Sequence, residues 1–166
     1  MIILDSNVLS ELMRPKPEAR VIAWLDRQPQ TSIWTTSVTV FEILFGLRAM
    51  LTGRRRAIYT QGFEGLLDGI DHRIAPFDTE AAQQASALMA SRKIQGRPRE
   101  LRDTMIAGIV LARHATLATR NTPHFDDVRA TLVDPWTASA GPHHNGQRDI
   151  LLTPAAYRLG GNSPQS

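Results

Sequence analysis

The sequence predicts an α/β fold with a mainly parallel central sheet flanked by helices. Residues 1–4 are an unbroken apolar run closed by Asp5, which is typical of a buried parallel strand. Short segments rich in β-formers then recur between amphipathic stretches, and this alternation implies βα units. We expect the further strands at residues 31–35, 72–77, 116–120 and 128–133. At 166 residues, the chain is long enough to bury a substantial core but too short for two ordinary domains.

Apolar residues at helical spacing indicate the helices between these strands. Prolines and glycines mark several of the helix ends: Pro15 and Pro29 end the first two, and Gly96 with Pro98 ends the fifth. Ser37 is a plausible N-cap for the third helix, and Asp78 for the fifth. We expect the helices at residues 8–13, 18–28, 37–51, 57–67, 79–95 and from 103 onward.

The folded unit is expected to span residues 1–136, and residues 137–166 to form a flexible tail. The composition changes beyond Thr137, where glycine and proline interrupt every apolar period. The pair His143 and His144 lies there, but two histidines without further ligands are weak evidence for a metal site.

Composition narrows the class of protein. Nineteen Lys and Arg against sixteen Asp and Glu give a net charge of +3, which is compatible with a nucleic-acid partner. The absence of cysteine excludes disulfides and thiolate metal sites, and it favours a reducing compartment. No apolar run approaches the length needed to span a membrane. We therefore expect a cytoplasmic protein with no membrane partner.

Four polar residues are expected to meet where parallel strands end. Asp5 follows the first strand, Asn121 follows a later strand, Glu42 interrupts the apolar side of the third helix, and Asp103 enters the first turn of the helix after Gly96. Each acid also has a purely structural interpretation. Asp5 can cap a helix, Glu42 can lie at the edge of an apolar stripe, and Asp103 suits the dipole of its helix.

Carboxylate and amide oxygens suit a hard divalent cation such as Mg²⁺ or Mn²⁺ rather than zinc. Such ions activate water and stabilise a leaving oxygen in phosphodiester hydrolysis. The pattern of acids therefore favours metal-assisted cleavage of nucleic acid.

Four blocks of sequence, MIILDSNVLSE, TSVTVFEILFGL, RDTMIAG and LATRNTPHF, closely resemble PIN-domain ribonucleases. The resemblance is to VapC-type toxins of type II toxin–antitoxin pairs, including the FitB-like group. It implies a PIN-like fold in which Asp5 and Asp103 bind Mg²⁺, Glu42 is the third acid and Ser6 lies beside the metal. Many PIN domains have Asp where this chain has Asn121, which lowers the charge of the site by one.

The resemblance also implies partners. These are an RNA substrate, a VapB-like antitoxin, a second copy of the chain in a homodimer, and operator DNA reached only through the antitoxin complex. Arginines are candidates for contacts to RNA phosphates. The alternative to an active ribonuclease is a catalytically silent PIN-like module that acts only through its antitoxin. The candidate RNA-binding residues are Arg54, Arg55, Arg56, Arg97, Arg99 and Arg102.

Overall fold

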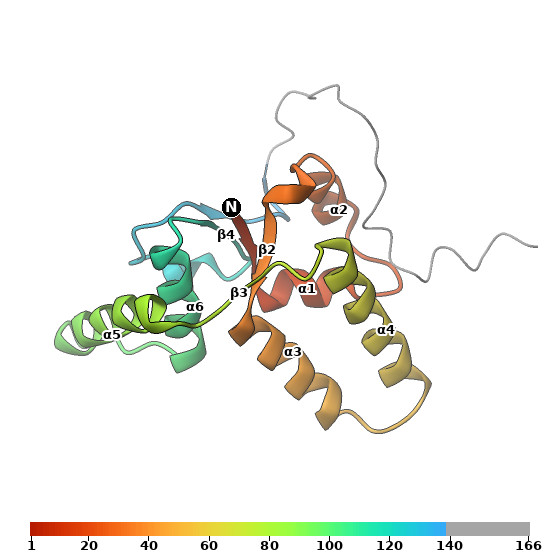
Figure 1. Cartoon of the computed structure of the whole chain (residues 1–166), viewed down its shortest axis with the longest axis horizontal. Helices are drawn as coiled ribbons and strands as arrows, with labels where there is room; N and C mark the ends of the chain where they lie inside the picture. Colours follow the sequence, from red (N-terminus) through yellow and green to blue (C-terminus); the bar gives the residue numbers. More distant parts are fainter. Residues whose placement is uncertain (139–166) are drawn as a thin grey trace, which may run out of the picture.

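Five parallel strands form one sheet in the computed structural model, which describes residues 1–138. The order β3-β2-β1-β4-β5 places β1 at the centre, paired with β2 on one side and β4 on the other (Figure 1). The predicted α/β class and the parallel sheet are therefore confirmed. The strands are β1 (Ile2–Leu4), β2 (Ile33–Thr36), β3 (Ile74–Ala75), β4 (Thr116–Ala118) and β5 (Leu132–Val133).

Helices connect successive strands and cover both faces of the sheet (Figure 1). On one face lie α5 and α6, and on the other α1, α2 and α4. The helices are α1 (Ser6–Leu12), α2 (Ala19–Leu25), α3 (Ser37–Ala49), α4 (Arg54–Gly69), α5 (Thr79–Ile94) and α6 (Leu101–Ala112), with short 3-10 helices η1 (Gln30–Ser32) and η2 (Thr122–Phe125).

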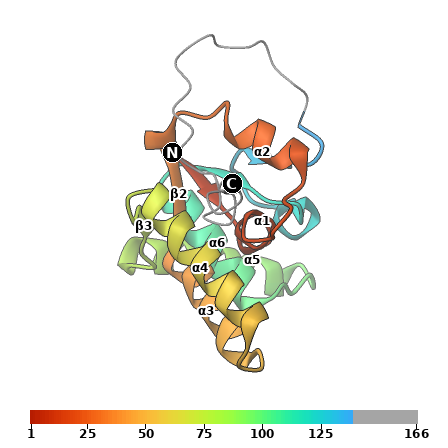
Figure 2. The same cartoon turned by 90° about the vertical axis from the view of Figure 1, so that its right-hand side faces the viewer.

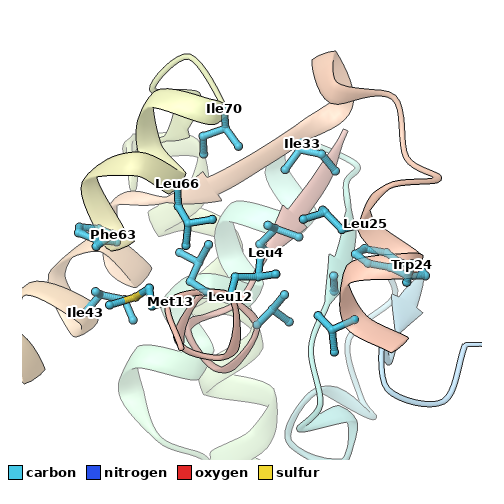
Figure 3. Packing of buried hydrophobic residues seen from close by; sticks show 14 of the residues in the cluster. Leu4, Leu12, Met13, Trp24, Leu25, Ile33, Ile43, Phe63, Leu66 and Ile70 are labelled. Carbon is cyan, nitrogen blue, oxygen red and sulfur yellow. The ribbon is translucent and has the colours of Figure 1, made fainter. Parts of the chain in front are cut away.

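The central strand supplies both layers of the core because its side chains alternate between the faces. Ile3 packs with α5 and α6, whereas Leu4 packs with α1, α2 and α4. Figure 3 shows this second cluster, in which Leu4 and Leu12 meet Trp24 and Leu66. The side chains of Ile3 and Leu4 are almost fully buried on opposite faces, so packing on both sides of the sheet fixes the register of β1.

Close packing sets the distance between α5 and α6. A Cβ added at Gly108 of α6 would lie 2.7 Å from the Cβ of Ala85 on α5, which is too close for any side chain. Glycine is therefore required at this position for the two helices to approach as they do. This contact helps to place α6, whose first turn carries Asp103.

Several details of the predicted elements were wrong. The N-cap of α3 is Thr36, whose hydroxyl accepts the Thr39 N–H, and the hydroxyl of Ser37 instead accepts the N–H of Phe77. The apolar spacing of the third helix predicts that Phe41 and Phe45 face the core, but they are 58% and 60% exposed, and other residues form the buried side of α3. That buried side consists of Val38, Thr39, Ile43 and Leu47.

The fourth helix begins earlier than predicted and includes the three arginines that were expected to precede it. Figures 1 and 2 both show α3 and α4 projecting from the sheet, with their connection at the far end. The start of α4 therefore lies away from the strand ends.

Most of the predicted tail, residues 139–166, including His143 and His144, lies outside the described part of the chain. Among residues 1–138, none of the helices combines the length and the hydropathy required to cross a bilayer.

Candidate active site

Asp5 lies at the end of the central strand and is 4% exposed. Its Oδ1 accepts the N–H of Ser6 at 2.7 Å, so Asp5 caps α1, as one of the two interpretations predicted. Its Oδ2 accepts two further hydrogen bonds, from Thr119 Oγ1 at 2.7 Å and from Asn7 Nδ2 at 2.8 Å. The capping role and the position at the strand tip therefore coexist in one carboxylate.

Thr119 was not singled out from the sequence. Its hydroxyl donates to Asp5 and accepts from Asn7 Nδ2 and from the N–H of Asn121, both at 3.0 Å. Asn7 Oδ1 in turn accepts the N–H of Arg120 at 3.1 Å. The available signal was positional: Thr119 directly follows β4, the strand next to β1, so its side chain meets Asp5 at the same edge of the sheet.

Glu42 lies in the second turn of α3, with its side chain 17% exposed. Its Oε2 is buried and has no hydrogen-bond partner in residues 1–138, while Oε1 lies 3.6 Å from Nε of Arg102. Burial raises the pKa of Glu42 above its usual value, and the charge of Asp5 raises it further. The Ser6 hydroxyl and Arg102 oppose this pKa shift. A buried carboxylate oxygen without a protein partner has the chemistry to accept a hydrogen bond from water or to bind a cation.

Asp103 occupies the first turn of α6, as predicted, with its side chain 16% exposed. Its Oδ2 lies 2.7 Å from Nδ1 of His124, a residue of η2 that was not singled out from the sequence. The charge of Asp103 contributes to the raised pKa of both Asp5 and Glu42. The three acids therefore form one electrostatically coupled group.

Asn121 is placed just beyond β4, at the start of η2. Its backbone N–H donates to Thr119, which is the bonding partner of Asp5. The structure thus brings Asn121 next to the acid group through Thr119. A carbonyl contribution of Asn121 to a metal site stays a prediction.

Burial is the main cause of the raised pKa of Asp5, and the hydrogen bonds from Thr119, Ser6 and Asn7 oppose it. The three acids therefore concentrate negative charge on largely buried side chains, a condition that a divalent cation relieves. Across residues 1–138, no three Asp, Glu or His side chains are already close enough together to hold an ion by themselves. The donor set still fits Mg²⁺, which usually takes one or two carboxylates and keeps several waters.

The candidate arginines divide into two groups. Arg102 reaches Glu42 and Glu100, and Arg97 and Arg99 both contact the carboxylate of Asp126, at 3.2 and 3.1 Å. Arg102 therefore lies beside the acids, whereas Arg97 and Arg99 lie at Asp126, the residue after η2. Residues 54–56 begin α4, at the projecting end of the α3–α4 pair, so the prediction that they lead RNA toward the acids is not supported by their position.

The central strand of a parallel sheet ends in Asp5, and α3 and α6 carry two further acids that interact with it electrostatically. These features define an α/β protein with a carboxylate site. The chain belongs to the PIN domain family, whose model matches residues 2–130. The predicted family resemblance is thereby confirmed.

The chain is 37% identical over 137 residues to the VapC ribonuclease Y4jK of Sinorhizobium fredii, covering 82% of this chain and 98% of that protein. It is 32% identical over 137 residues to toxin FitB of Neisseria gonorrhoeae, covering 82% of this chain and 99% of that protein. Among solved structures, the crystal structure of FitAcB from Neisseria gonorrhoeae has a TM-score of 0.76 at 32% identity. That match covers 83% of this chain and 100% of the other.

Proposed function

We propose that this protein is a metal-dependent endoribonuclease and the toxin of a VapBC-like toxin–antitoxin pair. The observation that carries the proposal is the electrostatic interaction of Asp5, Glu42 and Asp103, together with a buried Glu42 oxygen that has no hydrogen-bond partner within residues 1–138. Relatives named as a VapC ribonuclease and as a tRNA(fMet)-specific endonuclease VapC support the choice of RNA as substrate.

Asp5 and Asp103 are the residues that would hold Mg²⁺, with Mn²⁺ as a substitute. When bound, the ion would lower the pKa of a water molecule and stabilise the leaving oxygen. The chain's own residues prepare this chemistry. Thr119 and Asn7 orient Asp5, and His124 orients Asp103.

Glu42 has the position of a general base. Its raised pKa makes the Glu42 carboxylate a stronger proton acceptor, and its Oε2, without a hydrogen-bond partner in the described part of the chain, is the oxygen that would take a proton from an attacking water. Ser6 links the two acids: its hydroxyl is 3.5 Å from Asp5 Oδ1, and its hydrogen bond to the Glu42 carboxylate opposes the raised pKa of Glu42. We propose that the side-chain amide of Asn121 adds a further polar group beside the three acids.

Arg97, Arg99 and Arg102 are the proposed contacts to RNA phosphates. Arg97 and Arg99 both contact the carboxylate of Asp126, which supports the proposal that the two guanidinium groups bind one small anion. An RNA phosphate that displaces the Asp126 carboxylate from these arginines would accept hydrogen bonds from the same two guanidinium groups.

We further propose a homodimer, an antitoxin partner and an indirect link to operator DNA. Structures named FitAB bound to an IR36 DNA fragment and FitAcB support the antitoxin and DNA parts of this proposal. The exposed, mutually stacked rings of Phe41 and Phe45 support the homodimer, because apolar surface of this kind is usually covered by a partner. Cellular RNA is the proposed substrate, so we expect the protein to act in the cytoplasm.

The test is digestion of a mixed RNA pool by the purified full chain with Mg²⁺, with Mn²⁺ and with a chelator. Cleavage should require the metal, and an Asp5→Asn variant that keeps the helix cap should be inactive. If no RNA is cut under any condition while the chain still binds its antitoxin, the silent interaction module replaces the enzyme.

A further inference from the structure

Arg92 is a buried cation on α5 that the proposed chemistry does not use. It is 3% exposed, and its guanidinium donates two hydrogen bonds of 2.7 Å to the carboxylate of Asp127. Burying such a pair removes two charges from water, so the pair is not by itself a source of stability. Its remaining contacts show what the pair holds in place.

Those contacts reach the two segments that meet at the candidate active site. Arg92 Nη1 donates to Thr104 Oγ1 at 2.8 Å, and Nη2 donates to the carbonyl oxygen of His124 at 3.3 Å. Thr104 directly follows Asp103, and Asp103 Oδ2 lies 2.7 Å from His124 Nδ1. One guanidinium therefore binds the neighbour of Asp103 and the backbone of His124, the two partners in the Asp103–His124 contact.

Each end of this arrangement is fixed a second time. The Thr104 hydroxyl accepts from Arg92 and donates to the carbonyl oxygen of Glu100 at 3.0 Å, which secures the first turn of α6. Asp127 lies two residues after η2, so its bonds to Arg92 secure the segment that carries His124.

The contact between Asp103 and His124 needs such support. The side chain of His124 is 43% exposed, so its own burial does not hold the ring in place. Arg92 supplies a rigid, planar fork whose hydrogen bonds leave in fixed directions. Lysine has a point charge on a flexible stem and cannot reproduce that set of bonds.

We propose that Arg92 is a positioning residue for the active site. From α5 it fixes the first turn of α6 relative to η2, so that His124 orients the carboxylate of Asp103. The proposal deepens the proposed nuclease function and rests on it. It assigns to α5 a role in the geometry of the reaction, although α5 contributes none of the clustered acids.

The test compares Arg92→Lys with Arg113→Lys. Arg113, the C-cap residue of α6, pairs with Asp78, the N-cap residue of α5, at the other end of the same two helices. It is therefore a control for replacing an ion-paired arginine of these helices by lysine. With Mg²⁺ and a mixed-sequence fluorogenic RNA, Arg92→Lys should lower kcat about tenfold, because small misplacements of a reacting group slow catalysis strongly. KM should stay within about twofold, and Arg113→Lys should change neither constant by more than about twofold.

A second readout does not depend on cleavage. The side-chain ¹⁵N–¹H correlation of His124 in the metal-free protein should move in Arg92→Lys and stay unchanged in Arg113→Lys. If the wild type cleaves no RNA but the His124 signal moves, the proposed function fails and the positioning role stands. If the signal and kcat are both unchanged in Arg92→Lys, the positioning role is overturned.

Thr104→Val provides the variant to use if Arg92→Lys does not fold, because it removes only the hydroxyl that Arg92 contacts. It should also move the His124 signal and lower kcat. A double variant with His124→Ala completes the test. The kcat loss from Arg92→Lys should be smaller in the His124→Ala background than in the wild type, because the two residues act through one contact. If the kcat losses of Arg92→Lys and His124→Ala instead multiply in the double variant, the two residues act independently and the proposal is contradicted.

Discussion

Thr119 and Asp5 are 114 positions apart in the sequence, yet Thr119 Oγ1 donates to Asp5 Oδ2 across 2.7 Å. The bond joins the ends of two neighbouring parallel strands and opposes the pKa increase that burial imposes on Asp5. It therefore helps to keep the carboxylate ionised in a site with little water.

Thr119→Val should raise the pKa of Asp5 further and leave the Asn121 N–H without its acceptor. We expect the free energy of unfolding to fall by about 1–3 kcal/mol. Cleavage should fall about tenfold or more, as is common when a residue that orients a metal ligand is lost. Chemical denaturation and RNA digestion measure both effects. Thr116→Val, at the start of the same strand, is the control and should stay within about 0.5 kcal/mol of the parent.

Asn121→Asp should keep or raise activity, because it restores the acid that many PIN domains carry and adds a charge toward the cation. Calorimetric titration with Mn²⁺ should show tighter binding. Loss of both activity and affinity would mean that the Asn121 amide must donate a hydrogen bond, which Asp cannot do.

The variant Asp103→Asn distinguishes two roles for Asp103: binding a metal with the other acids, or only interacting favourably with the dipole of α6. Because Asp103 raises the pKa of Asp5 and Glu42, removing its charge relieves repulsion, and the metal-free variant should melt at or above the parent temperature. Magnesium should stabilise the variant much less than the parent, and cleavage should be nearly lost.

Thermal melts of the parent and of Asp103→Asn, in chelator and in excess Mg²⁺, distinguish these two roles of Asp103. A purely dipolar role predicts instead a loss of about 0.3–1 kcal/mol in either condition, with cleavage retained.

The raised pKa values of Asp5 and Glu42 predict a specific pH dependence for the metal-free protein. In the window above their ordinary values of 3.8 and 4.5, the folded state holds more protons than the unfolded state. The contribution of these groups to stability is therefore present at low pH and is lost as pH rises through the folded-state values.

Glu42→Gln removes one of these groups, so its stability relative to the parent should increase as pH rises. Each unit of pKa shift corresponds to about 1.4 kcal/mol. Denaturation curves between acid and neutral pH, in chelator, measure the difference. A difference that is constant with pH would contradict a raised pKa for Glu42.

A chain ending at Thr137 should melt at the same temperature as the full chain. Residues beyond this point lack the apolar periodicity that would offset the entropy of ordering them. A decrease of several degrees, or loss of soluble expression, would show that the segment around Ile150 packs on the domain.

Local patterns predicted the main features of the fold and the acids. The apolar run before Asp5 specifies a buried strand with a polar end, and Gly96 with Pro98 marks the helix boundary before Asp103. Thr119 and His124 were missed because their roles depend on pairing between distant segments, which no local period encodes. Phe41 and Phe45 match an apolar stripe, but periodicity does not show whether a stripe faces the core or a partner.

The double role of Asp5 affects genetic selections for loss of toxicity. Cells that survive production of the protein should often carry changes at codon 5, but for two different reasons. A change to alanine removes the cap of α1 as well as the acid, so it lowers the amount of folded protein in the cell. A change to asparagine keeps a capping side chain and removes only the charge. Survivors with asparagine should still accumulate folded protein that can bind the proposed antitoxin, whereas survivors with alanine should not.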